Sequence, residues 1–403
     1  MAREFDVVLF GATGFTGRLV ADYLARKAPA GTRIALAGRS KPKLEEIQRG
    51  LPDNAKAWPL LVVDSNDKPA LAALAPRTTV VCTTVGPYAK YGLPLVEACA
   101  NAGTHVCDLT GEVQFMRDAI DRYHAAAVAS GARIVHTCGF DSIPSDLGVW
   151  LLHRAHGTLK RVTYVVESLR GGFSGGTIAS LVNGVDEAMA DRARRRIMGD
   201  PYALSPDRAK EPDLGNERDL ATFRYDDFTQ RWVAPFVMAT INTRVVRRSN
   251  ALLDYAYGRE LRYAEVSGMG TGPGGALRAA GLTAGLGAFM ASLATPFTRK
   301  LVLGRLPQAG EGPSEEARRN GRVRIRFVAE TGAGKRVGLL VKGSGDPGYQ
   351  LTSMLLGESA LCLAHDGAKL PQRAGCLTPA TAMGDLLVER LRAGGMTWDL
   401  VDA

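Results

Sequence analysis

The sequence lacks the cysteine and histidine patterns of disulfide-rich and zinc-binding proteins. Its six cysteines contain no Cys-x-x-Cys pair, and its six histidines are scattered. No apolar segment follows a basic one at the N-terminus, which passes directly into a strand-like run. We therefore expect reduced and mostly buried thiols, no bound metal, no secretory signal and a cytoplasmic location.

Acidic residues are too few to balance the basic ones, so the chain carries a net charge of +9. The basic residues are nevertheless dispersed, apart from short groups such as residues 194–196, and no basic stripe interleaved with aromatics is present. We expect no nucleic-acid partner. Positive charge also attracts phosphorylated cofactors, carrier-bound thioesters and anionic membrane surfaces, and charge alone does not separate these partners.

The first part of the chain alternates short apolar runs with helical patterns. Residues 6–10 form a continuous apolar run, typical of a parallel strand buried on both faces, and a helical pattern follows through Leu24. The same alternation continues to residue 137. It predicts an α/β fold, a Rossmann-like doubly wound parallel sheet of about six strands, which we assign to residues 1–150.

The pattern changes after His153, where strands become longer and more alternating, as in residues 161–169 and 322–330. A chain of 403 residues is also long enough for two domains. We predict a second, α+β domain with a mixed or antiparallel sheet over residues 151–377. Residues 378–403 carry a final helix.

One segment departs from the pattern of soluble proteins. Residues 279–297 carry no charge over a length close to the roughly 20 residues that cross a bilayer. The segment is rich in glycine and alanine and has Pro296 near its end. Three interpretations stay open: a buried helix or helix pair, a surface that inserts into a membrane or lines an acyl chain, and a true membrane span.

A glycine-rich loop follows the first predicted strand and opens the first helix. Gly11 permits the tight turn, Gly14 lets the backbone approach a pyrophosphate, and Gly17 lets helix and strand pack closely. The helix N-terminus adds amide donors and the positive end of its dipole. The spacing is Gly-x-x-Gly-x-x-Gly, and its position between strand and helix predicts a dinucleotide site.

The end of the second strand indicates which dinucleotide binds. A carboxylate there would bond the ribose hydroxyls of NAD, but residues 38–41 are Gly-Arg-Ser-Lys. Arg39 can stack on adenine and pair with a 2′-phosphate, so NADP(H) is favoured. Asp64 ends the third strand, where it could meet the adenine or be an ordinary loop aspartate, and Val85 begins the loop expected beside the nicotinamide. The predicted cofactor-binding residues are Gly11, Thr13, Gly14, Phe15, Thr16, Gly17, Arg39, Ser40, Lys41, Asp64, Ser65, Val85, Gly86 and Pro87.

A Tyr-x-x-x-Lys pair, which short-chain dehydrogenases use as catalytic acid and helper, occurs at Tyr23 and Lys27. It lies on the first crossover helix, behind the glycine loop and away from any nicotinamide. We interpret the pair as a coincidence, and ordinary short-chain dehydrogenase chemistry is not expected.

Several motifs together resemble a known family. Residues 11–17, 85–88, 108–112 and 138–148, with the sequences GATGFTG, VGPY, DLTGE and CGFDSIPSDLG, resemble the saccharopine dehydrogenase-like oxidoreductases. In the second half, residues 200–202, 241–251 and 377–384, with the sequences DPY, INTRVVRRSNA and LTPATAMG, are similar to the bacterial trans-acting enoyl reductase branch. The resemblance covers nearly the whole chain.

The resemblance implies a Rossmann domain, a mixed-sheet domain and a C-terminal helix that returns to the first domain. It also implies NADPH-dependent reduction of an enoyl thioester or lipid-like substrate, supplied in trans to a polyketide synthase carrier domain. Peripheral contact with the inner membrane and a homodimer are compatible with it. Two alternatives stay open: an amino-acid dehydrogenase like saccharopine reductase, and a non-catalytic NADPH-binding protein associated with lipid or membrane.

Catalytic candidates lie in loops after strand ends, where the crevice of such a sheet opens. Tyr88 follows the fourth strand and can donate to an enolate, or instead pack against the nicotinamide. Glu112 follows the fifth strand, where its carboxylate also suits a helix N-terminus. Asp141 follows the sixth strand, with helix capping as its alternative role. The basic group of residues 244–248 could bind a phosphopantetheine phosphate, or lie on a solvated strand face.

Overall fold

The computed structural model describes residues 3–171, 175–306 and 311–403. The chain forms two compact units: the first contains residues 1–143, 309–312 and 348–394, and the second contains residues 144–308, 313–347 and 395–403. After a short return at residues 309–312, the main return to the first unit begins at residue 348 rather than at 378, and the last residues go back to the second unit.

The first unit is built on a parallel seven-stranded sheet in the order β13-β6-β5-β4-β1-β2-β3. This is the predicted Rossmann-like arrangement, extended beyond β6 by a strand from the returning segment. Its strands are β1 (Phe5–Phe10), β2 (Ile34–Gly38), β3 (Leu60–Val62), β4 (Thr78–Thr83), β5 (His105–Asp108), β6 (Arg133–Val135) and β13 (Gly375–Leu377).

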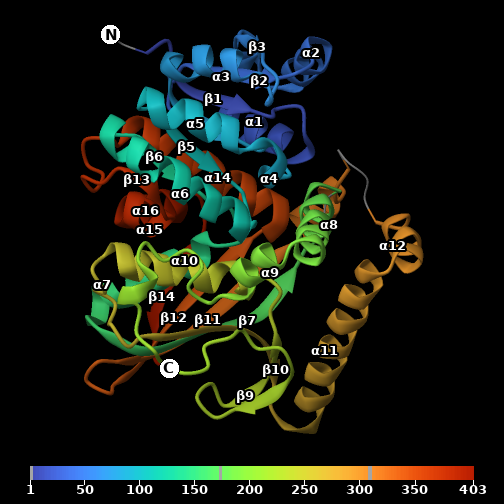
Figure 1. Cartoon of the computed structure of the whole chain (residues 1–403), viewed down its shortest axis with the longest axis vertical. Helices are drawn as coiled ribbons and strands as arrows, with labels where there is room; N and C mark the ends of the chain where they lie inside the picture. The colour runs from blue at the N-terminus through green and yellow to red at the C-terminus, as the bar shows by residue number, and fades with distance from the viewer. Residues whose placement is uncertain (1–2, 172–174, 307–310) are drawn as a thin grey trace. The chain divides into compact units, whose positions relative to one another are not determined.

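Crossover helices connect these strands, as the alternating pattern predicts. They are α1 (Phe15–Lys27), α2 (Lys41–Gly50), α3 (Lys68–Leu74), α4 (Tyr88–Tyr91), α5 (Leu93–Ala102) and α6 (Val113–Ser130). The returning segment adds α14 (Thr352–His365), α15 (Pro379–Ala382) and α16 (Gly384–Ala393). Helix α14 packs along α1 and against β4 and β5, so late residues cover the face of the early sheet (Figure 1).

The Tyr23 side chain has a structural partner in α14. Its hydroxyl donates to Glu358 at 2.6 Å, and Glu358 in turn accepts from Arg390 of α16. Tyr23 therefore belongs to the packing of α1 against the returning helices, in keeping with its exclusion from a short-chain dehydrogenase site.

The second unit contains a mixed seven-stranded sheet in the order β14-β12-β11-β7-β10-β9-β8. Only β7 and β10 pair in parallel among its described strands; the other pairs are antiparallel. The strands are β7 (Leu159–Arg170), β8 (Arg224–Asp226), β9 (Arg231–Pro235), β10 (Arg262–Gly270), β11 (Arg322–Thr331), β12 (Arg336–Ser344) and β14 (Thr397–Val401).

Helices surround this second sheet. They are α7 (Ile143–His156), α8 (Gly175–Ala190), α9 (Arg192–Gly199), α10 (Ala239–Leu252), α11 (Gly272–Ala294), α12 (Pro296–Leu303) and α13 (Glu315–Arg319). Against the prediction of a solvated strand face, residues 244–248 lie in α10, which packs on β10. Arg244, Arg247 and Arg248 are all buried there.

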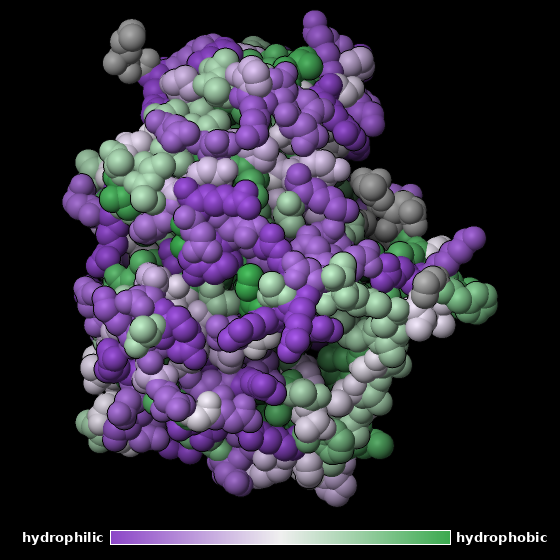
Figure 2. Space-filling view, in the orientation of Figure 1, coloured by the Kyte–Doolittle hydropathy of each residue, from purple (hydrophilic) through white to green (hydrophobic). Residues whose placement is uncertain are grey.

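The apolar segment forms most of α11 and the start of α12. Helix α11 is long and apolar enough to cross a membrane by length and composition, but only 11% of its most hydropathic window is buried. The interpretation as a buried helix is therefore wrong. Figure 2 shows the outer surface of α11 as a band of apolar side chains.

The close contact between α7 and the second sheet gives a test of the packing. A Cβ on Gly148 would lie 2.1 Å from Cζ of the buried Phe327, so Gly148→Ala forces this core to shift. We expect the free energy of unfolding to fall by about 1–3 kcal/mol, measured by chemical denaturation. Gly281→Ala in α11 is the matched control, because no atom lies within 4 Å of the added methyl group. A Gly148→Ala protein as stable as the control would contradict this packing.

Candidate functional site

The glycine loop has the geometry that a pyrophosphate site requires. Gly11 has a φ of +94°, and a Cβ on it would lie 2.8 Å from Thr84 Oγ1. A Cβ on Gly17 would lie 2.1 Å from the Gly11 carbonyl oxygen, so only glycine lets α1 approach the end of β1 this closely. Gly14, in contrast, is exposed, and a Cβ on it would lie 3.5 Å from its nearest neighbour, the Gly11 carbonyl oxygen. The backbone at Gly14 is therefore accessible to a ligand.

The N-terminus of α1 is open to an anion. Its N-cap, Gly14, makes no side-chain cap bond, and the first turn contains no acidic residue. The amide donors of the first turn and the dipole of α1 therefore suit a phosphate group. Phe15 in this turn packs edge-on against Tyr349 of the returning segment, with ring centroids 5.1 Å apart.

Arg39 lies where the 2′-phosphate of NADP(H) is expected. It follows β2, is exposed, and has no hydrogen-bonding or ionic partner in the part of the chain that the structure describes. Lys41 is exposed and lies 3.9 Å from Glu45, and Ser40 is the N-cap of α2 without a side-chain cap bond. No carboxylate occupies residues 38–41. The end of β2 thus fits a phosphorylated ribose better than a bare one.

The other predicted cofactor residues lie in loops after β3 and β4. Asp64 forms a local turn in which its carboxylate accepts from the Asn66 amide at 2.8 Å. Thr84 donates from its hydroxyl to the Gly11 carbonyl at 3.1 Å, which holds the β4 loop beside the glycine loop. Val85 contacts the same glycine, since a Cβ on Gly11 would lie 2.8 Å from its side chain.

Tyr88 and Glu112 together connect the loops after β4 and β5. The Glu112 carboxylate accepts from the backbone amides of Tyr88 and Ala89, both at 2.9 Å, at the first turn of α4. The Tyr88 hydroxyl donates to the Thr83 carbonyl and accepts from the Leu109 amide, both at 3.2 Å. Burial, with added repulsion from Asp108, raises the pKa of Tyr88 well above its usual value. Both side chains are therefore engaged with backbone groups.

Asp108 connects the ends of β5 and β6. Its carboxylate pairs with Nδ1 of the buried His136 at 2.6 Å and accepts from the Thr110 and Thr137 amides at 3.0 and 3.3 Å. Burial lowers the pKa of His136, but the charge and the hydrogen bond of the nearby Asp108 carboxylate together have a larger effect in the opposite direction. The net result is a pKa of about 9. His136 is therefore protonated at neutral pH, and the pair is ionic.

Asp141 differs from the other two catalytic candidates. It is half-buried and lies beside Gly111, whose Cβ would be 4.0 Å from Oδ2 of Asp141. No hydrogen bond or ion pair is made by its carboxyl group within the described residues. Burial raises its pKa to about 6. Asp141 is thus the candidate whose carboxyl group keeps its proton to a higher pH than an ordinary aspartate and could release it to a ligand.

The buried arginines of α10 bind the chain itself. Arg244 pairs with Asp219, and Arg248 donates to the Leu204 carbonyl at 2.6 Å. Arg247 donates to the Tyr263 carbonyl at 3.2 Å and lies 3.7 Å from Glu217. A phosphate-binding role for this group is not supported, because the guanidinium groups hold residues 198–219 on the second unit.

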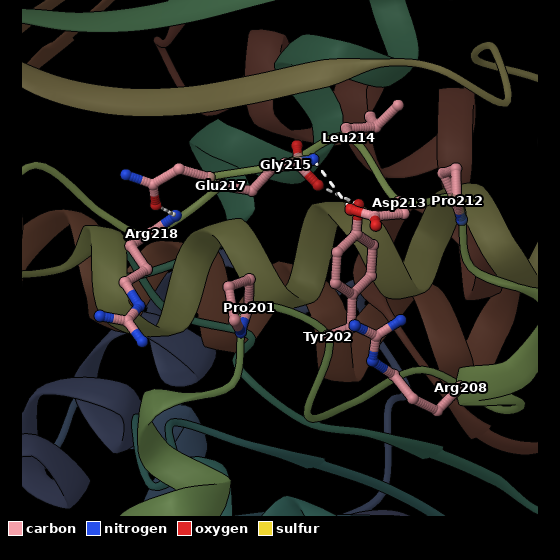
Figure 3. Close-up of a pocket in the computed structure, with 10 residues that line it drawn as sticks. Pro201, Tyr202, Arg208, Pro212, Asp213, Leu214, Gly215, Glu217 and Arg218 are labelled. Carbon is pink, nitrogen blue, oxygen red and sulfur yellow. Dashed lines mark hydrogen bonds between the residues drawn. The ribbon is translucent and has the colours of Figure 1, made fainter.

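A pocket of about 410 Å³ lies in that same segment (Figure 3). The Tyr202 hydroxyl bonds Glu217, and the ring of Tyr202 lies between Arg208 at 4.6 Å and Arg247 at 5.2 Å. The Tyr202 side chain is therefore held by charged groups of the same unit. It is lined by Pro201, Tyr202, Arg208, Pro212, Asp213, Leu214, Gly215, Asn216, Glu217 and Arg218.

No cluster of three or more metal-ligating side chains occurs within residues 3–171, 175–306 and 311–403. All six cysteines are buried thiols.

Some residues that shape the site were missed in the sequence. Thr84 directly follows β4, a position opposite the glycine loop in a parallel sheet, so its role could have been inferred. Asp108 lies within the recognised DLTGE motif, but its pairing with His136 depends on the register of β5 and β6. Tyr349 carried no signal, because it comes from a segment more than 300 residues later.

Comparisons with known proteins agree with this geometry. A family model described as the saccharopine dehydrogenase NADP binding domain matches residues 7–135. A Mycobacterium tuberculosis protein named as a candidate trans-acting enoyl reductase is 49% identical over 98% of this chain and 97% of its own length. A trans-acting enoyl reductase of Mycobacterium bovis is 42% identical with the same coverage.

A solved structure shares the fold. Saccharopine dehydrogenase (L-Glu forming) from Saccharomyces cerevisiae aligns over 98% of this chain and 99% of its own, with a TM-score of 0.54 and 16% identity. The predicted two-part architecture is confirmed. Since the family model covers the glycine loop and the ends of β2 to β5, the prediction that this domain binds NADP(H) is confirmed as well.

The role of Arg39 can be tested by cofactor preference. We expect Arg39→Ala to weaken NADPH binding about 10- to 100-fold, the loss typical of a charge-assisted hydrogen bond, and to leave NADH binding nearly unchanged. Calorimetric titration of both cofactors measures this. Arg49→Ala, which removes an exposed arginine at the other end of α2, is the control. Equal losses for NADPH and NADH would rule out recognition of the 2′-phosphate by Arg39.

Proposed function

Because the chain belongs to the family of trans-acting enoyl reductases, within the saccharopine dehydrogenase-like oxidoreductases, we propose that it reduces an enoyl thioester with NADPH. The substrate we propose is a lipid or polyketide acyl chain carried by a polyketide synthase. The observation that carries the proposal is Asp141, a half-buried carboxyl group with a raised pKa and no bonding partner in the described residues.

The reaction adds a hydride to the β-carbon and a proton to the α-carbon of the enoyl group. NADPH supplies the hydride when bound. We assign the proton to the Asp141 carboxyl group, which becomes a carboxylate as the α-carbon is protonated. Because the side chain is half-buried, water can reach it and restore the proton before the next turnover.

Tyr88 and Glu112 act in this proposal as positioning residues. Their hydrogen bonds hold the loops after β4 and β5 against each other, so the nicotinamide end of the crevice keeps its shape. Neither group has to leave its backbone partners during the reaction. The protonated carboxyl of Asp141 is then the acid that the site presents to the substrate.

An amino-acid dehydrogenase activity is less well supported. Such an enzyme needs cationic side chains that converge on the carboxylates of its substrate. The basic group of α10 is buried and bonded within its own unit, so it does not serve this purpose. We place the enzyme in the cytoplasm, in peripheral contact with the inner membrane, where lipid-linked acyl chains are found.

Asp141→Asn tests the proton assignment. We expect kcat for an enoyl thioester to fall by about 10²- to 10⁴-fold, the usual contribution of a general acid. The wild-type kcat should decline as pH rises through about 6, where Asp141 loses its proton, and the variant should lose this dependence. A steady-state pH profile with a purified thioester measures both. A variant with the wild-type rate and profile would exclude Asp141 as the donor.

The same substitution has an independent effect on stability. Burial raises the folded-state pKa of Asp141 to about 6. The contribution of Asp141 to the free energy of unfolding is therefore highest below about pH 4, where Asp141 is protonated, and it falls as pH rises through about 6. Asp141→Asn should therefore raise the free energy of unfolding by about 3 kcal/mol at pH 8 and change it much less at pH 4 and below. Asp53→Asn, at an exposed position, is the control. A variant less stable than wild type at pH 8 would contradict the burial of this charge.

A further inference from the structure

We propose that helices α11 and α12 form an arm that binds the surface of an anionic lipid bilayer. This apolar arm comprises residues 272–306 of the second unit. The proposal specifies the membrane contact by its residues and its lipid, and it does not depend on the reaction assigned to Asp141.

The arm exposes apolar side chains that a soluble unit would normally cover. Leu277 is 77% exposed, Met290 42%, Phe297 83% and Leu301 53%. The helical backbone is uncovered as well, because a Cβ added at Gly281, Gly285 or Gly287 would meet no atom within 4 Å. Helix α11 is therefore apolar on most of its circumference and has little of that surface buried (Figure 2).

The arm is bonded to its unit near both ends, which favours a helix that lies on a bilayer surface over one that spans the bilayer. At its start, Arg278 donates to the Met269 carbonyl at 2.8 Å, and Gly275 packs against the end of β10. After α11, Arg299 pairs with Asp186 of α8 at 2.6 Å and donates to the Leu293 carbonyl at 2.7 Å. A helix held near both ends on one body fits the bilayer interface better than a path across the bilayer.

The charge of the arm identifies the surface that it fits. Residues 272–306 contain no aspartate or glutamate and four basic residues, Arg278, Arg299, Lys300 and Arg305. Lys300 and Arg305 are exposed on or just after α12, next to Leu301. Apolar side chains flanked by cations suit acyl chains beneath anionic headgroups. A second copy of this chain would instead bring like charges together, so the observations favour a lipid surface over a homodimer.

Aromatic side chains near the start of α11 extend this surface. Phe223 and Tyr225 are 38% and 40% exposed, and both rings pack on Trp232 of β9. Trp232 reaches the arm, because a Cβ on Gly275 would lie 3.2 Å from its Cδ1 atom. Tyrosine and tryptophan favour the headgroup level of a bilayer, so this cluster suits the rim of a membrane contact.

Vesicle co-sedimentation of the full-length protein tests the proposal. We expect binding to vesicles of phosphatidylcholine and phosphatidylglycerol in equal parts, much weaker binding to pure phosphatidylcholine, and weakening by high salt. The triple variant Leu277→Glu, Phe297→Glu, Leu301→Glu should reduce binding to the anionic vesicles by about tenfold or more, because each change places a charge in the interface.

The control is Leu400→Glu, which alters an equally exposed leucine on β14 outside the arm and should bind as the wild type does. All variants should keep the wild-type unfolding temperature and the wild-type rate with a soluble short-chain enoyl thioester. If none of the proteins, including the wild type, turns over this thioester, the proposed reaction is wrong. That result would not bear on the membrane contact. The proposed membrane binding by the arm would be contradicted if the wild-type protein did not bind anionic vesicles. It would also be contradicted if the triple variant bound them as the wild type does. A dimer, detected by light scattering, that the triple variant converts to monomers without affecting vesicle binding would contradict it as well.

Discussion

The site depends on the buried ion pair between Asp108 and His136. Asp108 ends β5, and its carboxylate bonds His136 and the amide of Thr137 beyond β6. Thr137 has a φ of +60°, a conformation that a threonine adopts only when its surroundings hold it. The pair therefore fixes the turn that leads to Asp141. Because Glu112 and Tyr88 extend the same bonding to the loop after β4, the ends of three neighbouring strands form one rigid edge.

This rigidity explains why three polar candidates in similar positions have different roles. The polar atoms of Tyr88 and Glu112 bond backbone groups, so these two side chains stabilise the loops that line the crevice. Asp141 makes no such bond within the described residues, and burial without a partner is what raises its pKa. An unpaired carboxyl group lowers stability at neutral pH. In the function proposed above, this loss of stability accompanies a proton held on Asp141 for the reaction.

Local patterns predicted the first unit well, because each strand there is a buried apolar run and each glycine of the loop has a local reason. The need for glycine at position 17 does not depend on distant segments, since α1 meets the end of β1 at that point. Non-local features were less predictable. The return of the chain at residue 348 rather than 378, and the packing of Tyr349 on Phe15, depend on contacts between distant segments.

The second unit shows the same limit. The arginines of residues 244–248 were compatible with a phosphate site or a solvated strand face, yet they lie buried in α10, where carbonyls and carboxylates of residues 198–219 accept hydrogen bonds from them. Residues 279–297 left a buried helix, a lipid-binding surface and a membrane span open, and α11 is largely uncovered. Composition gives the polarity of a segment, whereas its burial depends on which partners the fold brings to it.

In the function proposed above, this NADP-dependent oxidoreductase reduces an enoyl thioester with a proton held on Asp141. The most direct test is product analysis after turnover of a carrier-bound enoyl thioester with NADPH deuterated at its transferable position. The account predicts a saturated acyl chain with deuterium at the β-carbon and hydrogen from solvent at the α-carbon. An unreduced acyl chain, together with deuterium transfer to the imine of a 2-oxo acid and an amine, would contradict it.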